Sequence, residues 1–195
     1  ISVDEGYEYL KKLPYEDIGH TKIDHHRLMR TGIPEVIFGK GKTKKQVIEI
    51  AEKMLSRNNN VLITRINKSI YNELIKLNDK FEYNESAKCS FLEIKPIDIK
   101  GGTVAIVCAG TSDLPVIEEA GITLKLLGNK YVKITDVGVA GIHRLFDKKQ
   151  ILESASVIIV CAGMEGALAS VVAGLVDKVV IAVPTSVGYG ASFSG

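Results

Sequence analysis

Four short runs of consecutive apolar residues divide the second half of the chain. They are rich in β-branched side chains, do not alternate with polar positions, and span residues 104–108, 131–135, 157–161 and 179–183. Such runs are typical of strands that are buried on both faces, as in a parallel sheet. Apolar residues at helical spacing occupy the intervals, over residues 114–127, 142–155 and 164–176. This alternation predicts an α/β fold, a three-layer, doubly wound, mostly parallel sheet of the flavodoxin-like or Rossmann-like kind.

The first half of the chain has shorter and more scattered elements. Thr43 and Gln46 have the spacing of a capping box, and apolar residues at helical intervals follow over residues 47–55. Residues 61–64 form a short β-rich run, and residues 70–77 again have helical spacing. We therefore expect a small α/β unit ahead of the parallel sheet.

Composition separates the same two halves. Residues 1–100 hold 33 of the 48 charged residues and 5 of the 18 glycines, whereas residues 101–195 hold 15 charged residues and 13 glycines. Residues 95–102 include a proline and a glycine pair and are typical of a linker. We predict a charged accessory domain over residues 1–97 and a catalytic α/β domain over residues 98–195. Because the sequence opens at an isoleucine and stops within a glycine-rich run, we expect the second domain to be incomplete at its C-terminus.

Charge and hydropathy exclude several classes of partner. A net charge of +2 gives no reason to expect a nucleic acid or an anionic membrane surface. The longest apolar runs are far below the roughly 18 residues that cross a bilayer. Three cysteines, Cys89, Cys108 and Cys161, are an odd number without metal-type spacing, which indicates reduced thiols and a cytoplasmic location. Cys108 and Cys161 end apolar strands, where packing is their expected role.

Two of the predicted strands end in nearly the same heptapeptide, 53 residues apart. Both run through a buried strand into Cys-Ala-Gly, at residues 104–110 and 157–163, and a third glycine-containing turn spans residues 184–190. In open α/β sheets, ligands bind beyond the carboxyl ends of the strands. We therefore expect the binding site at these turns.

The chemistry of the three turns suits a phosphate or another anion. Glycine permits close backbone approach, helix N-termini present free N–H groups, and hydroxyls add donors. The predicted substrate-binding residues here are Gly110, Thr111, Ser112, Gly163, Gly166, Pro184, Thr185, Ser186 and Gly188. The alternative is that Ser112, Asp113 and Thr185 only cap helices. Neither a dinucleotide Gly-x-Gly-x-x-Gly motif nor a Walker lysine follows any strand, so the standard NAD and ATP sites are not supported.

Ionisable residues in the same turns are candidates for catalysis. Asp113, His143 and Glu165 are the acid/base candidates, and spacing alone does not rank them. The guanidinium of Arg144 can bind a phosphate or a carboxylate. The imidazole of His143 can transfer protons near neutral pH. The alternative is that His143 and Arg144 face water at a helix start. Glu165 can instead interact with a helix dipole or order a metal, whose identity the sequence does not give.

The turns resemble those of the PurE family, the catalytic subunits of phosphoribosylaminoimidazole carboxylase. The matching segments are Gly-Thr-Ser-Asp at 110–113, Gly-Ile-His-Arg at 141–144, and 162–168 leading to Ala-Val-Pro at 182–184. This resemblance implies binding of an aminoimidazole ribonucleotide at the Ser-Asp and His-Arg turns, His143 as acid/base, and a homo-octamer. Two features depart from it. Ala167 stands where that family has a histidine, and residues 137–141 are longer and richer in glycine than the matching stretch.

A second resemblance, to the LarB family, covers both halves of the chain. It is carried by residues 24–39, 136–144, 162–167 and 183–193. LarB proteins are related to PurE and open the synthesis of the nickel-pincer nucleotide cofactor. The resemblance implies that the pyridinium ring of nicotinic acid adenine dinucleotide is carboxylated with carbon dioxide or bicarbonate. Hydrolysis of the phosphoanhydride, with Mg²⁺ as the expected cation, then releases AMP and pyridinium-3,5-biscarboxylic acid mononucleotide.

The same resemblance implies two further features. LarB proteins have a thiol nucleophile in a Ser-Cys-Ala stretch downstream of the turn at residues 188–193, and the printed sequence ends before that point. We expect the thiol beyond Gly195 and expect the chain as printed to bind nucleotide without turnover. Arg144, or the cationic segment that contains Arg27 and Arg30, is expected to help neutralise the pyrophosphate. The alternative is that this segment is only solvated surface. Two alternatives stay open: a PurE-type N-carboxyaminoimidazole ribonucleotide mutase of purine biosynthesis, and a nucleotide-binding module without catalysis.

Overall fold

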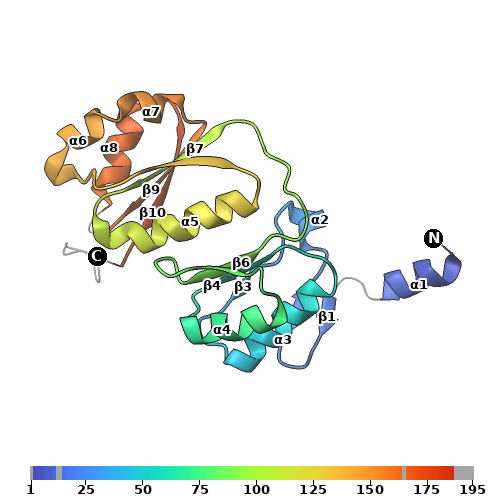
Figure 1. The fold of residues 1–195 in the computed structure, drawn as a ribbon. Helices are drawn as coiled ribbons and strands as arrows, with labels where there is room; N and C mark the ends of the chain where they lie inside the picture. Colours follow the sequence, from blue (N-terminus) through green and yellow to red (C-terminus); the bar gives the residue numbers. More distant parts are fainter. Residues whose placement is uncertain (1, 12–14, 164–165, 187–195) are drawn as a thin grey trace. The chain divides into compact units, whose positions relative to one another are not determined.

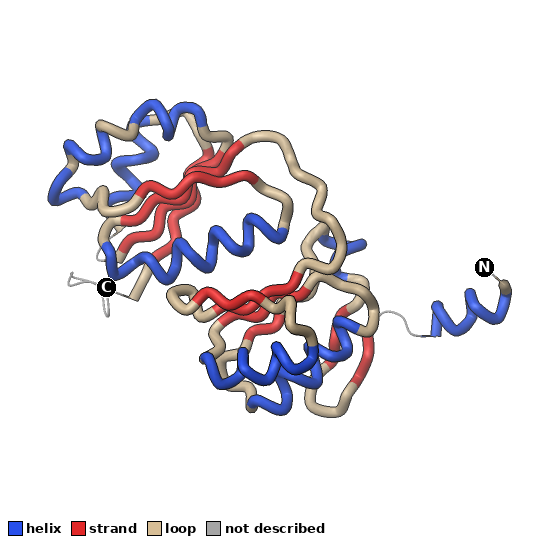
Figure 2. The backbone as a smooth tube through the Cα atoms, in the orientation of Figure 1, coloured by secondary structure: helices blue, strands red, loops and turns tan. Residues whose placement is uncertain are grey.

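The computed structural model describes residues 2–11, 15–163 and 166–186. The chain divides into two units, Ile1–Pro96 and Ile97–Gly195, each with its own sheet (Figures 1 and 2). Among the described helices, none is both long and apolar enough to cross a bilayer.

The second unit is built on a parallel sheet of four strands in the order β10-β9-β7-β8. The strands are β7 (Thr103–Cys108), β8 (Lys130–Ile134), β9 (Val157–Ala162) and β10 (Val179–Pro184). All three strand pairs are parallel, as the uninterrupted apolar runs predict. The chain first moves from β7 to β8 at one edge and then returns to the other side of β7 to form β9 and β10. This reversal is typical of the flavodoxin-like order.

Helices cover both faces of this sheet, so the unit has three layers (Figures 1 and 2). The helices are α5 (Leu114–Leu126), α6 (His143–Phe146), α7 (Lys149–Ser154) and α8 (Ala167–Leu175). On β7, Ala105 and Val107 belong to the core beneath α6, α7 and α8, whereas Ile106 and Cys108 face α5. Successive strand residues point to opposite faces, so both sets are buried. The predicted flavodoxin-like α/β fold is confirmed.

One predicted helix is divided in the structure. The apolar spacing predicts a single helix over residues 142–155, but α6 ends at Phe146 and α7 begins at Lys149. Lys148 between them leaves the helical conformation, with φ −102° and ψ 6°. Leu145 and Leu152 are both fully buried, so the division leaves the apolar stripe intact. Because neither glycine nor proline lies at the break, the sequence carries no signal for it.

The first unit is a smaller α/β layer. Its mixed sheet has the order β3-β4-β6-β5, in which β3 and β4 are parallel and the other pairs antiparallel. The strands are β3 (Ile37–Phe38), β4 (Val61–Thr64), β5 (Glu82–Asn84) and β6 (Cys89–Leu92). The helices are α1 (Val3–Lys11), α2 (Arg27–Thr31), α3 (Lys44–Leu55) and α4 (Lys68–Leu77). A hairpin of β1 (Tyr15–Asp17) and β2 (Lys22–Asp24) completes the unit.

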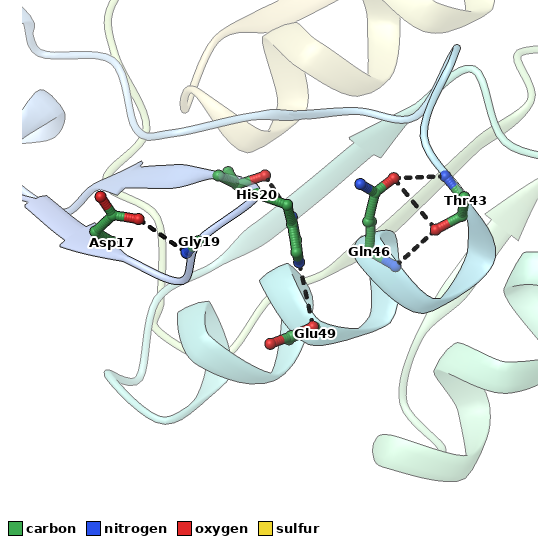
Figure 3. A network of polar contacts seen from close by, with 7 residues as sticks. Asp17, Gly19, His20, Thr43, Gln46 and Glu49 are labelled. Carbon is green, nitrogen blue, oxygen red and sulfur yellow. Dashed lines mark hydrogen bonds and ion pairs between the residues drawn. The ribbon is translucent and has the colours of Figure 1, made fainter.

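Side-chain contacts fasten the β1–β2 hairpin to α3 (Figure 3). His20 in the hairpin turn lies 2.9 Å from Thr21 Oγ1 through Nδ1 and 3.2 Å from Glu49 Oε2 through Nε2. At the start of α3, the Thr43 hydroxyl accepts from the Gln46 N–H, and the Gln46 side chain accepts from the Thr43 N–H. This is the capping box that the sequence predicts.

Glu16 is a second connection between the hairpin and α3. Its carboxylate lies 3.1 Å from His25 Nε2, 2.9 Å from Lys53 Nζ and 3.6 Å from Arg57 Nη2. The hydrogen bond from Lys53 is the main cause that lowers the pKa of Glu16. The His25 side chain is only 3% exposed, and this burial lowers the pKa of its imidazole, although the contact with Glu16 opposes the shift.

Candidate functional site

The order of strand addition reverses between β7 and β9, and the carboxyl ends of these two parallel strands lie side by side. Cys108 is paired with Cys161 in the last register position of the two strands. Just beyond it, the Ala109 N–H donates to the Cys161 carbonyl at 3.3 Å. A crevice at such a switch point is the usual ligand site of an open α/β sheet. The two Cys-Ala-Gly segments therefore lie where the sequence predicts the site.

The turn after β7 holds a buried carboxylate between two exposed hydroxyls and α5. Residues Thr111–Asp113 form one turn of 3₁₀ helix, in which Thr111 and Ser112 are exposed and Asp113 is 3% exposed. The Gly110 N–H donates to Asp113 Oδ2 at 3.1 Å. Ser112 caps neither this turn nor α5, since their N-cap residues are Gly110 and Asp113. Its hydroxyl faces solvent at the strand end, where the sequence places a phosphate.

The turn after β10 is bonded directly to that carboxylate. The Thr185 hydroxyl donates to Asp113 Oδ1 at 2.7 Å, and the Thr185 N–H donates to the Ala162 carbonyl at 3.0 Å. Thr185 is 7% exposed, so its hydroxyl is engaged within the protein, whereas Ser186 is exposed. The structure thus joins the ends of β7, β9 and β10 through Asp113 and Thr185. Spacing in the sequence did not show this contact between residues 72 positions apart.

The turn after β9 contains two glycines, Gly163 and Gly166, that belong to the described residues. Gly166 has a φ of +73°, a left-handed conformation that glycine adopts without strain, and it precedes the first residue of α8. Its N–H donates to the Gly163 carbonyl at 3.2 Å. Two of the predicted site residues, Glu165 and Gly188, lie outside the described residues.

The loop after β8 crosses to the end of β7. The Val137 and Gly138 N–H groups donate to the carbonyls of Cys108 at 3.2 Å and Ala109 at 2.9 Å. A Cβ at Gly138 would lie 2.9 Å from the Ala109 carbonyl oxygen, so this close approach requires glycine. The loop therefore brings the His143–Arg144 segment toward the same edge of the sheet.

An ion pair organises this loop, and one of its partners was missed in the sequence analysis. Asp136 Oδ2 lies 2.6 Å from Arg144 Nη1, and Asp136 has a left-handed φ of 57°. A Cβ at Gly141 would lie 2.6 Å from Arg144 Nε, so glycine leaves room for the folded-back guanidinium. The sequence does carry a signal for this turn, the Asp-Val-Gly segment at residues 136–138 after a predicted strand. Aspartate tolerates a left-handed φ better than most residues.

His143 and Arg144 both reach solvent. His143 is the first residue of α6 and is exposed, and the Arg144 side chain is 41% exposed beside Asp136. This placement is compatible with contact to a bound anion and equally with a solvent-facing pair at a helix start. Their roles stay predictions.

The cysteines are buried and unsuited to nucleophilic attack. Cys89, Cys108 and Cys161 are free thiols with no exposed surface. Burial raises the pKa of Cys108 and raises that of Cys161 to about 12. Because the thiolate is the reactive form, neither strand-end cysteine is suited to attack a substrate near neutral pH.

Arg27 and Arg30 lie in the first unit, on α2. Arg27 Nη1 is 3.6 Å from Glu35 Oε1, and Arg30 forms an ion pair with Asp24. Both side chains are substantially exposed, at 42% and 56%. The two cations are therefore partly balanced by carboxylates of their own segment, and their contact with nucleotide stays a prediction.

Over the ranges that the structure describes, no group of three or more histidine, cysteine, aspartate or glutamate side chains is placed to hold a metal ion. Asp113, the buried carboxylate at the strand ends, already accepts two hydrogen bonds. The Mg²⁺ that the LarB resemblance implies stays a prediction.

Comparison with known families covers both units. A family model described as the LarB/PurE-like N-terminal domain matches residues 15–95, and one described as AIR carboxylase matches residues 103–193. The chain belongs to the LarB/PurE-like family. The resemblance found in the sequence is thereby confirmed, with a LarB-type domain followed by an AIR carboxylase domain. Members of this family are enzymes, carboxylases or mutases.

One relative of the LarB/PurE-like family spans almost the whole chain. The uncharacterized protein MJ0165 of Methanocaldococcus jannaschii is 44% identical over 199 residues, which is 97% of this chain and 78% of the relative. Its name gives no activity.

Proposed function

We propose that this protein is a LarB-type enzyme that carboxylates and then hydrolyses nicotinic acid adenine dinucleotide. The products are AMP and pyridinium-3,5-biscarboxylic acid mononucleotide, a precursor of the nickel-pincer cofactor. One observation carries the proposal: a LarB/PurE-like N-terminal domain precedes the AIR carboxylase domain in the same chain. Ala167, at the start of α8 where PurE enzymes have a histidine, supports this choice over the mutase.

The proposed chemistry begins with a thiolate that adds to the cationic pyridinium ring and makes it an enamine. The enamine attacks carbon dioxide, a base removes the ring proton at the new carboxylate, and the thiolate leaves. Water then cleaves the phosphoanhydride. The buried Cys108 and Cys161 are not proposed as this thiol, because burial raises the pKa of both. Asp113, His143 and Glu165 are the proposed acid/base candidates.

The strand-end turns supply the proposed binding groups. The exposed hydroxyls of Thr111, Ser112 and Ser186 border the switch point, and Arg144 approaches from the β8 loop. A nucleotide phosphate bound there would accept hydrogen bonds from these hydroxyls and a charge-assisted bond from the guanidinium. Arg27 and Arg30 of the first unit are also proposed as nucleotide-binding residues.

A comparison of substrates tests the proposal. The full natural protein is incubated with nicotinic acid adenine dinucleotide, bicarbonate and magnesium, and in parallel with N-carboxyaminoimidazole ribonucleotide, and products are identified by mass spectrometry. We expect AMP and a carboxylated mononucleotide from the first mixture and no reaction in the second. Reaction of the second mixture alone would establish the PurE-type mutase. No product in either, with nucleotide still bound, would establish a binding module.

A cysteine substitution is the matched control for the nucleophile. Cys161→Ala removes a buried thiol of high pKa at the strand end. This variant should retain turnover, because the attacking thiol lies elsewhere in the proposal. Loss of turnover in a folded Cys161→Ala protein would assign the nucleophile to β9.

A further inference from the structure

The buried carboxylate of Asp113 occupies the centre of the three strand ends. Its Oδ2 accepts from the Gly110 N–H of its own turn, and its Oδ1 accepts from the Thr185 hydroxyl of the turn after β10. With 3% of its surface exposed, it offers little area to a ligand. Each carboxylate oxygen therefore already has a protein donor.

The position of Thr185 shows what these bonds hold in place. Its N–H donates to the Ala162 carbonyl at the end of β9, while its hydroxyl reaches across to the turn after β7. Ser186 is the next residue and is exposed at the same edge. Loss of the bond to Asp113 would release the segment that presents Ser186.

We infer that Asp113 is a positioning residue, which holds the turn after β10 against the turn after β7, and that it is not the acid/base of the reaction. The kinetic consequences of this inference rest on the proposed function. Its structural consequences rest only on the two hydrogen bonds of Asp113. Asp113 acts through Thr185: it fixes the turn that presents Ser186 to nucleotide. The proton-transfer candidates are thereby reduced to His143 and Glu165.

The chemistry of asparagine makes the inference testable. In Asp113→Asn, the amide oxygen can accept from the Gly110 N–H, and the amide NH₂ can donate to the Thr185 hydroxyl oxygen. Both connections survive while the capacity to accept a proton as a base is lost. Asp113→Ala removes both connections, Thr185→Val removes only the second, and Thr185→Ser retains it.

Two measurements on these variants separate positioning from catalysis. Hydrogen exchange of the Thr185 amide reports the turn without any need for activity. KM, kcat and the pH profile of kcat with nicotinic acid adenine dinucleotide report the reaction. Asp177→Asn, on a side chain that is 87% exposed, is the matched control for an aspartate-to-asparagine change.

The positioning role predicts one pattern across the set. Asp113→Ala and Thr185→Val should lose exchange protection at Thr185 and raise KM by about tenfold, since a buried polar partner is left unsatisfied in each. Their double variant should be no worse than Asp113→Ala alone, because that substitution already removes the contact with Thr185. Asp113→Asn and Thr185→Ser should restore protection and KM to within about threefold, with an unchanged pH profile of kcat.

Other results would overturn the inference. A collapse of kcat in Asp113→Asn with the Thr185 amide still protected would make Asp113 an acid/base residue. Unchanged protection in both Asp113→Ala and Thr185→Val would show that the contact does not hold the turn. If wild-type protein fails to turn over this dinucleotide, the proposed function fails, and the exchange measurement still decides whether Asp113 holds the turn.

Discussion

Single residues at the sheet edge are of two kinds, bonded within the protein or exposed to solvent. Asp113 and Thr185 are buried and bonded to each other, whereas Ser112 and His143 are exposed. A hydroxyl that is hydrogen-bonded within the protein helps to fix the shape of a site. An exposed hydroxyl can bind a ligand. We therefore expect Ser112, rather than Thr185, to contact a nucleotide.

Ser112→Ala is expected to weaken nucleotide binding by about 1 kcal/mol, roughly fivefold in Kd, because a hydrogen bond to phosphate is lost. Isothermal titration with the dinucleotide measures the change. Ser154→Ala is the control, since the Ser154 hydroxyl donates only to the Ile151 carbonyl at the end of α7. Equal affinity of both variants would remove Ser112 from the binding site.

Glu165→Gln is expected to abolish turnover while the protein stays folded. The substitution keeps the size of the side chain and removes its ability to take up a proton. Steady-state rates are compared with a thermal unfolding curve for the same preparation. Wild-type rates in a folded Glu165→Gln protein would leave His143 as the remaining acid/base candidate.

The elements around the site are fixed by close backbone contacts at their ends. The β8 loop hydrogen-bonds to the end of β7 through Val137 and Gly138, and α8 begins at the left-handed Gly166. At Gly138 an added Cβ would meet the Ala109 carbonyl oxygen, whereas at Gly166 there is space and the left-handed φ is what favours glycine. The glycines of this half therefore differ in their tolerance to substitution, in a way that depends on what lies beside each Cα.

Gly138→Ala and Gly174→Ala test this difference. A Cβ at Gly138 meets the Ala109 carbonyl oxygen at 2.9 Å, so the loop must shift, and we expect a loss of about 1–3 kcal/mol in stability together with weaker nucleotide binding. Gly174 lies in α8 with nothing within 4 Å of an added Cβ, so alanine there should stabilise the helix by up to about 1 kcal/mol. Urea unfolding of both variants measures the change. Equal stability of the two would contradict the close approach at Gly138.

The elements that could be predicted from the sequence are those with enough residues to show a period. The four strands of the parallel sheet and helices α3 and α5 were all located within a few residues. The hairpin β1–β2 and strand β5 have only three residues a strand, too few for an alternating pattern, and they form because a partner strand is present. The Asp113–Thr185 hydrogen bond could not be predicted either. The two residues are 72 positions apart in the sequence, and only the folded sheet brings them together.

At the scale of the whole molecule, the two units have separate hydrophobic cores. The first unit contains His25, whose imidazole is buried against Glu16 and has a lowered pKa. The unfolded imidazole takes up a proton below pH 6.5, whereas the folded one resists protonation. Stability from this group is therefore present above pH 6.5 and is lost as the pH falls from there toward the folded pKa.

We expect the first unit to lose stability between pH about 7.5 and about 5.5 in the wild type, and to lose less in His25→Gln. Glutamine can still donate to Glu16 but does not titrate. Urea unfolding followed by circular dichroism at the two pH values measures the midpoints. Equal acid sensitivity in both proteins would show that His25 is not the responsible group.

We propose above that the site fixes carbon dioxide onto a pyridinium ring. The most direct measurement supplies ¹³C-bicarbonate with nicotinic acid adenine dinucleotide to the full natural protein and locates the label by NMR of the mononucleotide product. The proposal predicts a single labelled carboxylate on the pyridinium ring, released together with AMP. AMP together with an unlabelled nicotinic acid mononucleotide would show a hydrolase without carboxylation and would contradict it.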